Sequence, residues 1–193
     1  MTPHRIAIFA SGSGTNAEAI FKYFLNHPSI EVVLLLSNNP NAFALERAMK
    51  FNVPTRVFTK AQFRNSNDVL NWLREYRVTH IALAGFLWLI PKYLLQEFSD
   101  RIINIHPALL PKFGGKGMYG MKVHELVKTA AEKETGITVH LVNDQYDEGT
   151  IVFQAKCTVD SNDTPEQIAS KVHQLEYAHY PRIIEEWILI GKR

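Results

Sequence analysis

The chain has 193 residues, 46% of them hydrophobic, and its 21 basic and 19 acidic side chains give a formal charge of +2. This length suits one well-packed domain, residues 1–193, and is short for two. So small a positive excess, without a block of consecutive Lys or Arg, argues against a nucleic-acid surface. No apolar stretch approaches the roughly 20 residues needed to span a bilayer, which argues against a membrane protein.

The single cysteine, Cys157, excludes an intrachain disulfide and fits a reducing compartment. It lies within an expected strand, so we expect it to serve packing rather than reactivity. Residues 1–10 are interpreted as a lead-in and a buried strand rather than a signal peptide, because a glycine turn and a helix follow directly. We therefore expect a soluble, cytoplasmic protein.

Short apolar runs alternate with amphipathic segments in the first half of the chain, a pattern typical of βαβ units. We expect strands at residues 5–10, 31–36, 55–58, 80–84 and 102–105. Between them we expect helices at residues 16–26, 42–51, 67–76 and 91–98. The pattern predicts an α/β fold with a mostly parallel central sheet.

The second half begins with four glycines within residues 112–120, which predicts a loop. A helix is then expected at residues 121–131, followed by strands at 136–142 and 151–159. The last helix opens with Thr164 and Gln167 at the spacing of a capping box. We expect Pro181 to kink or restart this helix.

A glycine turn, residues 11–17 (Ser-Gly-Ser-Gly-Thr-Asn-Ala), joins the first strand to the first helix. Backbone N–H groups at such a helix start bind phosphate or carboxylate, and Thr15 or Asn16 can add a donor or a cap. The turn also fits the G-x-G-x-x-A dinucleotide pattern, but residues 37–39 supply no acid to hold a ribose. We therefore favour a mononucleotide or sugar-phosphate site over a dinucleotide site or a turn without ligand.

Asn104 and His106 end the fifth expected strand, two positions apart. Residues at i and i+2 of a strand share a face, so both should project together at the end of the sheet, where ligand crevices lie. A carboxamide beside an imidazole suits a reaction in which a carbonyl oxygen gains charge and a proton moves. The alternative is a polar strand end that caps loop backbone.

An acidic loop follows His140, which closes another expected strand. An acid near His106 would orient the imidazole, hold its charged form or relay a proton. The candidates are Asp144, Asp147 and Glu148, and periodicity alone does not choose among them. The alternative is a solvated acidic loop.

Metal binding is not indicated. His173, Glu176 and His179 fall at i, i+3 and i+6 of the last helix, but no H-E-x-x-H motif or Cys/His cluster supports a site.

Taken together, these motifs resemble the folate-dependent formyltransferases. The resemblance is carried by residues 8–16, 83–86, 104–112 (Asn-Ile-His-Pro-Ala-Leu-Leu-Pro-Lys) and 138–149. The glycine turn narrows it to the branch with a phosphoribosyl substrate. The resemblance implies a Rossmann-like, three-layer formyltransferase fold. It also implies transfer of a formyl group from 10-formyltetrahydrofolate to the amine of glycinamide ribonucleotide in purine biosynthesis.

The resemblance also assigns residues to roles. It implies a catalytic Asn–His–Asp triad (Asn104, His106, Asp147), hereafter the triad. The substrate phosphate would be held by Gly14, Thr15 and Asn16, and the ribose by Glu176. The residues implied for the folate are Leu87, Trp88, Leu89, Ile90, His140 and Asp144.

Two departures from the family pattern concern the folate. Leu87 and Trp88 stand where members often carry Met-Arg, and residues 114–120, hereafter the glycine-rich loop, replace a proline-glycine-histidine run. Residues 87–90 would wall a flat heterocycle or, as the alternative, form an apolar core cluster.

Two other functions compete with the transferase. A formyltetrahydrofolate hydrolase would use water in place of the amine, but it needs no sugar-phosphate turn. A non-catalytic nucleotide-binding regulator would use the glycine turn alone and leave the triad unexplained. All three take small-molecule ligands, and the sequence is compatible with a monomer or a homodimer.

Overall fold

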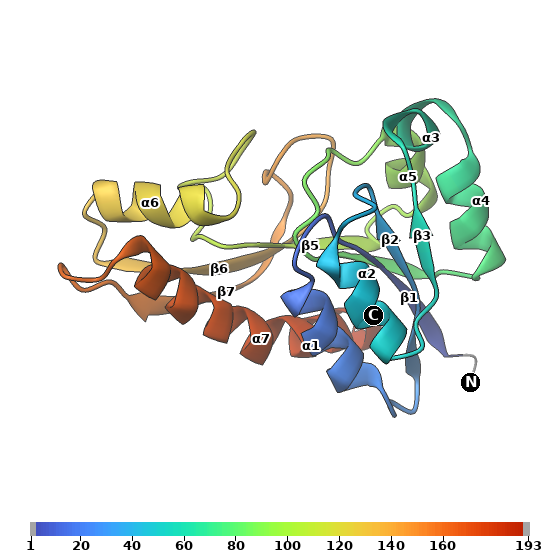
Figure 1. Ribbon diagram of the computed structural model, residues 1–193, viewed down its shortest axis with the longest axis horizontal. Helices are drawn as coiled ribbons and strands as arrows, with labels where there is room; N and C mark the ends of the chain where they lie inside the picture. Colours follow the sequence, from blue (N-terminus) through green and yellow to red (C-terminus); the bar gives the residue numbers. More distant parts are fainter. Residues whose placement is uncertain (1–2, 191–193) are drawn as a thin grey trace.

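The computed structural model describes residues 3–190 as a seven-stranded sheet with helices on both faces (Figure 1). The strands are β1 (His4–Phe9), β2 (Ile30–Ser37), β3 (Thr55–Val57), β4 (His80–Leu83), β5 (Ile102–His106), β6 (Glu134–Leu141) and β7 (Ile151–Thr158). The helices are α1 (Thr15–Phe24), α2 (Phe43–Lys50), α3 (Lys60–Asn65), α4 (Asp68–Glu75), α5 (Lys92–Glu97), α6 (Met121–Thr129) and α7 (Pro165–Ile190).

The strand order is β3-β2-β1-β4-β5-β6-β7. Strands β1 to β5 pair in parallel, whereas β6 and β7 pair antiparallel. The predicted α/β fold with a mostly parallel sheet is therefore confirmed. Because the chain moves outward from β1 to β3 and then returns to β4, the order reverses between β1 and β4. Ligands of open α/β sheets bind at such a switch point, outside the carboxyl ends of the strands.

Strand β1 shows how the core is divided between the two faces. Ile6 and Ile8 belong to a buried cluster that includes residues of α1, α2 and α7. Ala7 and Phe9 belong to a second cluster that includes residues of α3, α4 and α5. Side chains of a strand alternate between faces, so burial on both faces requires the continuous apolar run that the sequence shows.

Helix α7 is tied to the centre of the sheet by Tyr180, which is fully buried. Its hydroxyl donates to the carbonyl oxygen of Leu83 at 2.9 Å and approaches that of Ile103 at 3.3 Å. The helix runs through Pro181 to Ile190 as one element, so a restart at Pro181 is wrong, while the kink stays a prediction. Burial of the proline in the packed core holds this turn helical despite the lost backbone donor.

One helix was not expected from the sequence, α3. It is stabilised by a capping box in which Thr59 and Gln62 bond reciprocally. The other expected elements are present, with ends shifted by at most two residues. Residues 1–2 of the expected lead-in lie outside the described residues. Within residues 3–190 we find no helix that combines the length and apolar character needed to cross a membrane.

Candidate active site

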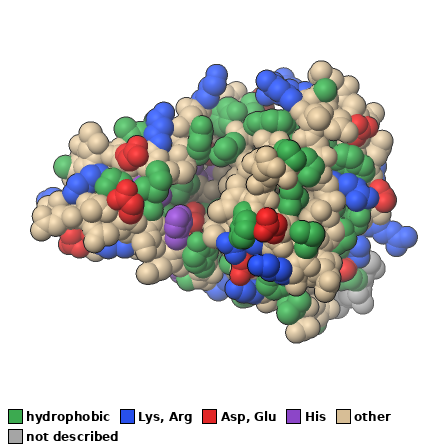
Figure 2. Space-filling view, in the orientation of Figure 1, with side chains coloured by type: hydrophobic (Ala, Val, Ile, Leu, Met, Phe, Trp, Pro, Cys, Tyr) green, Lys and Arg blue, Asp and Glu red, His purple; other side chains and the backbone are tan. Residues whose placement is uncertain are grey.

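A cavity of about 610 Å³ opens at the carboxyl ends of β1, β4 and β5, at the switch point of the sheet. Its walls come from the glycine turn, residues 84–87, the end of β5, the glycine-rich loop, the acidic loop after β6 and helix α7. In Figure 2 a hollow is visible near the middle of the face, with basic and acidic side chains interspersed around it.

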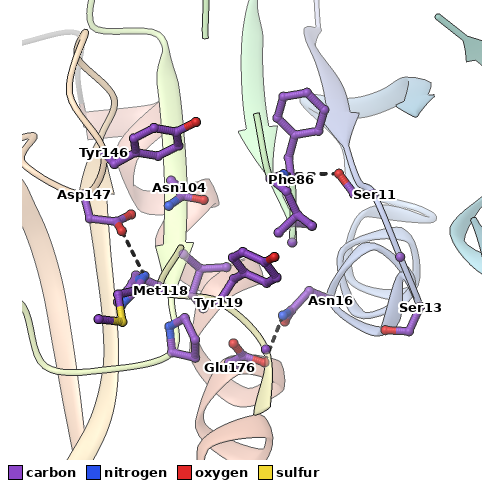
Figure 3. A pocket seen from close by; sticks show the side chains of 18 of the residues that line it. Ser11, Ser13, Asn16, Phe86, Asn104, Met118, Tyr119, Tyr146, Asp147 and Glu176 are labelled. Carbon is purple, nitrogen blue, oxygen red and sulfur yellow. Dashed lines mark hydrogen bonds and ion pairs between the residues drawn. The ribbon is translucent and has the colours of Figure 1, made fainter. Parts of the chain in front are cut away.

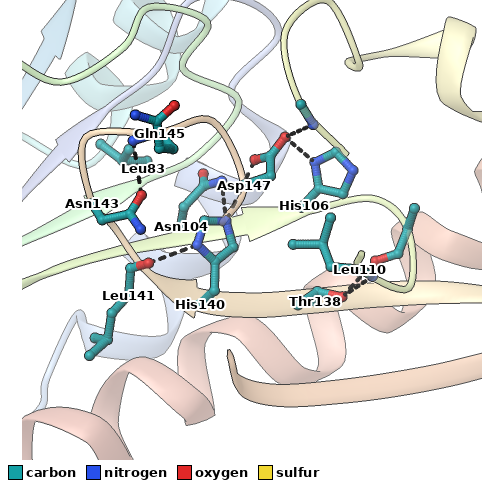
Figure 4. Close-up of polar contacts among 12 residues, drawn as sticks. Leu83, Asn104, His106, Leu110, Thr138, His140, Leu141, Asn143, Gln145 and Asp147 are labelled. Carbon is teal, nitrogen blue, oxygen red and sulfur yellow. Dashed lines mark hydrogen bonds and ion pairs between the residues drawn. The ribbon is translucent and has the colours of Figure 1, made fainter. Parts of the chain in front are cut away.

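Asn104 and His106 both line the cavity from β5, as the strand spacing predicted. Nδ2 of Asn104 lies 3.1 Å from Nε2 of His140 on the adjacent strand β6 (Figure 4). Nδ1 of that ring lies 2.8 Å from the carbonyl oxygen of Leu141. A carbonyl only accepts, so Nδ1 carries the hydrogen and Nε2 of the neutral ring accepts from Asn104. The second amide hydrogen of Asn104 is left free for a ligand.

His106 is almost completely buried, and both ring nitrogens have protein partners. Nε2 lies 2.8 Å from the carbonyl oxygen of Phe113, and Nδ1 lies 3.4 Å from Oδ2 of Asp147. Because the carbonyl requires a hydrogen on Nε2, Nδ1 of the neutral ring is an acceptor. Burial lowers the pKa of His106 below its usual value, although Asp147 and the Phe113 carbonyl act in the opposite direction. The ring is therefore neutral at pH 7 and able to take up a proton.

Among the three acids of the loop after β6, Asp147 is the one that lies next to His106. Its Oδ2 accepts from the backbone N–H of Gly115 at 2.9 Å, and its Oδ1 lies 3.6 Å from Nε2 of His140. Burial alone would raise its pKa, but the neighbouring imidazoles and the Gly115 donor outweigh burial and hold the pKa below its usual value. Asp144 and Glu148 are exposed and are not among the described residues that line the cavity.

On the opposite side of the cavity, the glycine turn leads into α1. Gly14 has φ +72°, and a Cβ at this position would lie 2.5 Å from Ala44. Its carbonyl accepts from the N–H of Glu18, the first turn of the helix. The N–H groups of a first turn have no acceptor within the helix, and Thr15 and Asn16 line the cavity. This is the geometry of an anion site.

Glu176 lies beneath this turn on α7 (Figure 3). Nδ2 of Asn16 donates to its Oε2 at 2.9 Å. The side chain is buried, and burial raises the pKa of Glu176 to about 7, while the Asn16 donor acts in the opposite direction. A carboxylate at the cavity floor is suited to accept from ligand hydroxyls.

Of the six residues implied for the folate, one is found in the described lining of the cavity. Leu87 lines the cavity and is 41% exposed. The ring of Trp88 packs against those of Phe58 and Phe63, with centroids 6.0 and 5.8 Å apart. This packing corresponds to the apolar core alternative. The others are also absent from the described lining: Leu89 is half-buried, Ile90 is buried, His140 lies behind Asn104 and Asp144 is exposed.

Several lining residues had no assigned role from the sequence. Lys116 is the sole Lys or Arg among the described residues of the lining. His124 and His173 bring α6 and α7 together, with ring centroids 6.2 Å apart. Burial lowers the pKa of His124 to about 4, so this ring is neutral. These residues meet through tertiary packing. The glycine content of the loop was the sequence signal for Lys116, and His173 was noted only for its helical spacing with Glu176 and His179.

No group of three or more His, Cys, Asp or Glu side chains within residues 3–190 is arranged to hold a metal ion. His173, Glu176 and His179 are included in that statement.

Comparison with known proteins shows the family to which this chain belongs. The formyl transferase family model matches residues 4–184, so the chain belongs to this family of enzymes. The chain is 37% identical over 194 residues to phosphoribosylglycinamide formyltransferase of Bacillus subtilis, covering 98% of this chain and 97% of that protein.

Plant relatives and a solved structure agree with this assignment. The chain is 41% identical over 187 residues to the chloroplastic phosphoribosylglycinamide formyltransferase of Arabidopsis thaliana, covering 93% of this chain. It spans 64% of the length of that protein and 60% of a Vigna unguiculata relative of the same name. The crystal structure of phosphoribosylglycinamide formyltransferase from Anaplasma phagocytophilum has a TM-score of 0.85 and 33% identity, covering 95% of this chain and 86% of that chain. The expected Rossmann-like formyltransferase fold is thereby confirmed.

Proposed function

We propose that this chain transfers the formyl group of 10-formyltetrahydrofolate to the amine of glycinamide ribonucleotide, a step of purine biosynthesis. The observation that carries the proposal is that one cavity is lined both by the glycine turn before α1 and by Asn104, His106 and Asp147. A hydrolase or a regulator would have no need for both. The names of the relatives support the same substrate.

The ribonucleotide would bind with its phosphate at the start of α1, on Gly14, Thr15 and Asn16. Glu176, which Asn16 contacts at 2.9 Å, would accept from the ribose hydroxyls. The glycinamide would then extend toward the triad on the other side of the cavity (Figure 3). Such anchoring turns an encounter of two substrates into a nearly unimolecular step.

The folate would enter beside Leu87 and Tyr146, both of which line the cavity. Trp88, Leu89 and Ile90 support this wall from the core side, whereas His140 precedes the acidic loop on β6 and Asp144 lies within that loop. Bound here, the formyl carbon would lie between the amine and the triad.

In the chemical step, the amine nitrogen forms a bond to the formyl carbon, and the carbonyl electron pair moves to oxygen. The free amide hydrogen of Asn104 stabilises this oxyanion. Nδ1 of His106 accepts the proton that the attacking nitrogen loses. The resulting imidazolium is stabilised by Asp147 at 3.4 Å and by the Phe113 carbonyl at 2.8 Å.

Collapse of the intermediate restores the carbonyl and breaks the bond to the folate nitrogen. That nitrogen takes the proton from His106, directly or through water, and leaves as tetrahydrofolate. The imidazole returns to its neutral form, so the proton is conserved through the cycle.

The test is a spectrophotometric assay of the purified protein with 10-formyltetrahydrofolate, with and without glycinamide ribonucleotide. Deformylation that requires the ribonucleotide, with one formyl group recovered on it per folate consumed, supports the transferase. Deformylation that is independent of the ribonucleotide would instead indicate a hydrolase. Nucleotide binding without turnover would indicate a regulator.

A further inference from the structure

Ser11, which follows β1, lies between two walls of the cavity. One is the glycine turn, and the other is the segment 84–87 after β4, hereafter the Leu87 wall. Ser11 is 8% exposed, and its hydroxyl makes two hydrogen bonds. Oγ accepts from the backbone N–H of Leu87 at 3.1 Å and donates to Oδ1 of Asn38 at 2.7 Å. Figure 3 shows the first of these contacts reaching across to the segment after β4.

The backbone of Ser11 completes the connection. Its N–H donates to the carbonyl oxygen of Gly85 at 3.0 Å, and its carbonyl accepts from Nδ2 of Asn39 at 3.3 Å. One residue thus joins the carboxyl ends of β1, β2 and β4 at the switch point of the sheet. Every polar group of Ser11 has a partner.

The glycine turn and the Leu87 wall depend on the Ser11 hydroxyl to different degrees. The glycine turn has other supports, because Gly12 accepts from the N–H of Ala44 at 3.1 Å and Ser13 accepts from Nε of Arg47 at 2.9 Å. Among the described residues, Leu87 itself makes one hydrogen bond, from its N–H to the Ser11 hydroxyl.

Apolar packing holds that wall from its other side. The ring of Phe86 packs edge-on against Phe9, with centroids 5.3 Å apart. The packing restrains the Phe86 ring and the Ser11 N–H holds Gly85, whereas the N–H of Leu87 is held by the Ser11 hydroxyl. The direction in which Leu87 enters the cavity therefore depends on this hydrogen bond.

We propose that Ser11 is a positioning residue. It fixes the Leu87 wall relative to the glycine turn and thereby sets the affinity for the folate. The proposal rests on the proposed function, since that function places the folate beside Leu87. Ser11 contacts neither reacting group; it acts through the Leu87 backbone.

The test compares Ser11→Ala with Ser66→Ala. Ser66 is a matched control, because its hydroxyl also accepts from a backbone N–H (Asp68, 3.2 Å) and donates to an oxygen (Gln62, 3.1 Å), yet it does not line the cavity. For Ser11→Ala, KM for 10-formyltetrahydrofolate should rise roughly fivefold, as expected for one lost hydrogen bond. KM for the ribonucleotide and kcat should stay within about twofold of wild type. Ser66→Ala should change neither KM.

Two further variants separate positioning from a general packing defect. Ser11→Thr keeps the hydroxyl and should restore the folate KM. Asn38→Asp keeps the acceptor for that hydroxyl and should resemble wild type. A Ser11→Ala enzyme with an unchanged folate KM would overturn the proposal, as would equal rises in both KM values.

Failure of the proposed function would be seen separately. Direct calorimetric titration of Ser11→Ala and wild type with tetrahydrofolate measures the same affinity without any turnover. Weaker binding to Ser11→Ala supports positioning even if the wild type transfers no formyl group. Equal binding to both proteins refutes positioning, whatever the wild-type activity.

Discussion

Nδ2 of Asn104 lies 3.1 Å from Nε2 of His140, and this contact orients the Asn104 amide at the cavity. Since His140 takes one amide hydrogen, the other remains for a developing oxyanion. Replacing Asn104 with Ala removes that donor. We expect kcat to fall at least tenfold, toward the 100- to 1000-fold typical of a lost oxyanion donor. Steady-state kinetics with an unchanged melting temperature checks this, and near-normal turnover would remove Asn104 from the mechanism.

His140 should be required for turnover although it does not line the cavity. His140→Leu removes the acceptor for Asn104 and one of the imidazoles that lower the pKa of Asp147. We expect kcat to fall about tenfold, with both KM values little changed, because the amide becomes free to rotate. Since the ring is buried, urea unfolding must accompany the kinetics. His140→Gln, which keeps an acceptor oxygen, should recover part of the rate; a variant as slow as His140→Leu would argue against this role.

Most of the fold was predictable because its signals are local. The parallel strands β1, β2, β4 and β5 are mostly buried, so each is visible as an apolar run. The capping box of α7 has Thr164 and Gln167 bonded as its spacing predicts, with 2.8 Å from the N–H of Thr164 to Gln167. The same signal, Thr59 and Gln62, begins α3, but that helix has only six residues and shows little periodicity.

Parts of the site were predictable for the same reason. Asn104 and His106 share a face because of strand geometry, and the glycine turn has a local conformational requirement. Which acid reaches His106 could not be decided locally. Asp147 is placed by a left-handed backbone, φ +59°, and by the Gly115 N–H from a distant loop. The positions of Lys116 and Leu87 at the cavity likewise depend on how the loops pack.

Thr15→Ala tests whether the glycine turn binds the phosphate of the ribonucleotide. Thr15 lines the cavity at the first residue of α1, where anions are stabilised by free N–H groups and the helix dipole. Loss of its hydroxyl should raise KM for the ribonucleotide roughly three- to tenfold, as expected for a bond to a charged group. KM for the folate should not change. An equal effect on both KM values would argue against a phosphate role.

Glu176 should make ribonucleotide binding depend on pH. Burial raises its pKa to about 7, so the carboxylate that we propose as the ribose acceptor is lost as the pH falls from 8 to 6.5. KM for the ribonucleotide should therefore rise over this range, while KM for the folate stays level. Glu176→Gln should have a higher KM that is independent of pH in the same window. A wild-type profile that is flat between pH 6.5 and 8 would contradict ribose binding by the ionised form.

The same carboxyl should affect stability with a defined sign. Burial penalises the ionised form, so the folded state binds the proton more tightly than the unfolded state. The penalty is absent below about pH 4.5 and complete above about pH 7. Glu176→Gln should accordingly unfold at higher temperature than wild type at pH 8, with the gain shrinking toward pH 5. Equal melting temperatures at pH 8 would mean that the carboxylate is solvated in the folded protein.

Gly14→Ala should destabilise the fold itself. A methyl group would lie 2.5 Å from Cα and Cβ of Ala44, at a backbone conformation (φ +72°) that L-residues rarely adopt. The left-handed conformation and the overpacking together should lower the free energy of unfolding by about 2 to 4 kcal/mol. Gly12→Ala is the matched control, because no atom lies within 4 Å of a Cβ there. Urea unfolding of both variants measures the difference. Equal stability of the two variants would mean that α1 and α2 separate easily to admit the methyl group. The glycine turn would then not be held rigidly by α2.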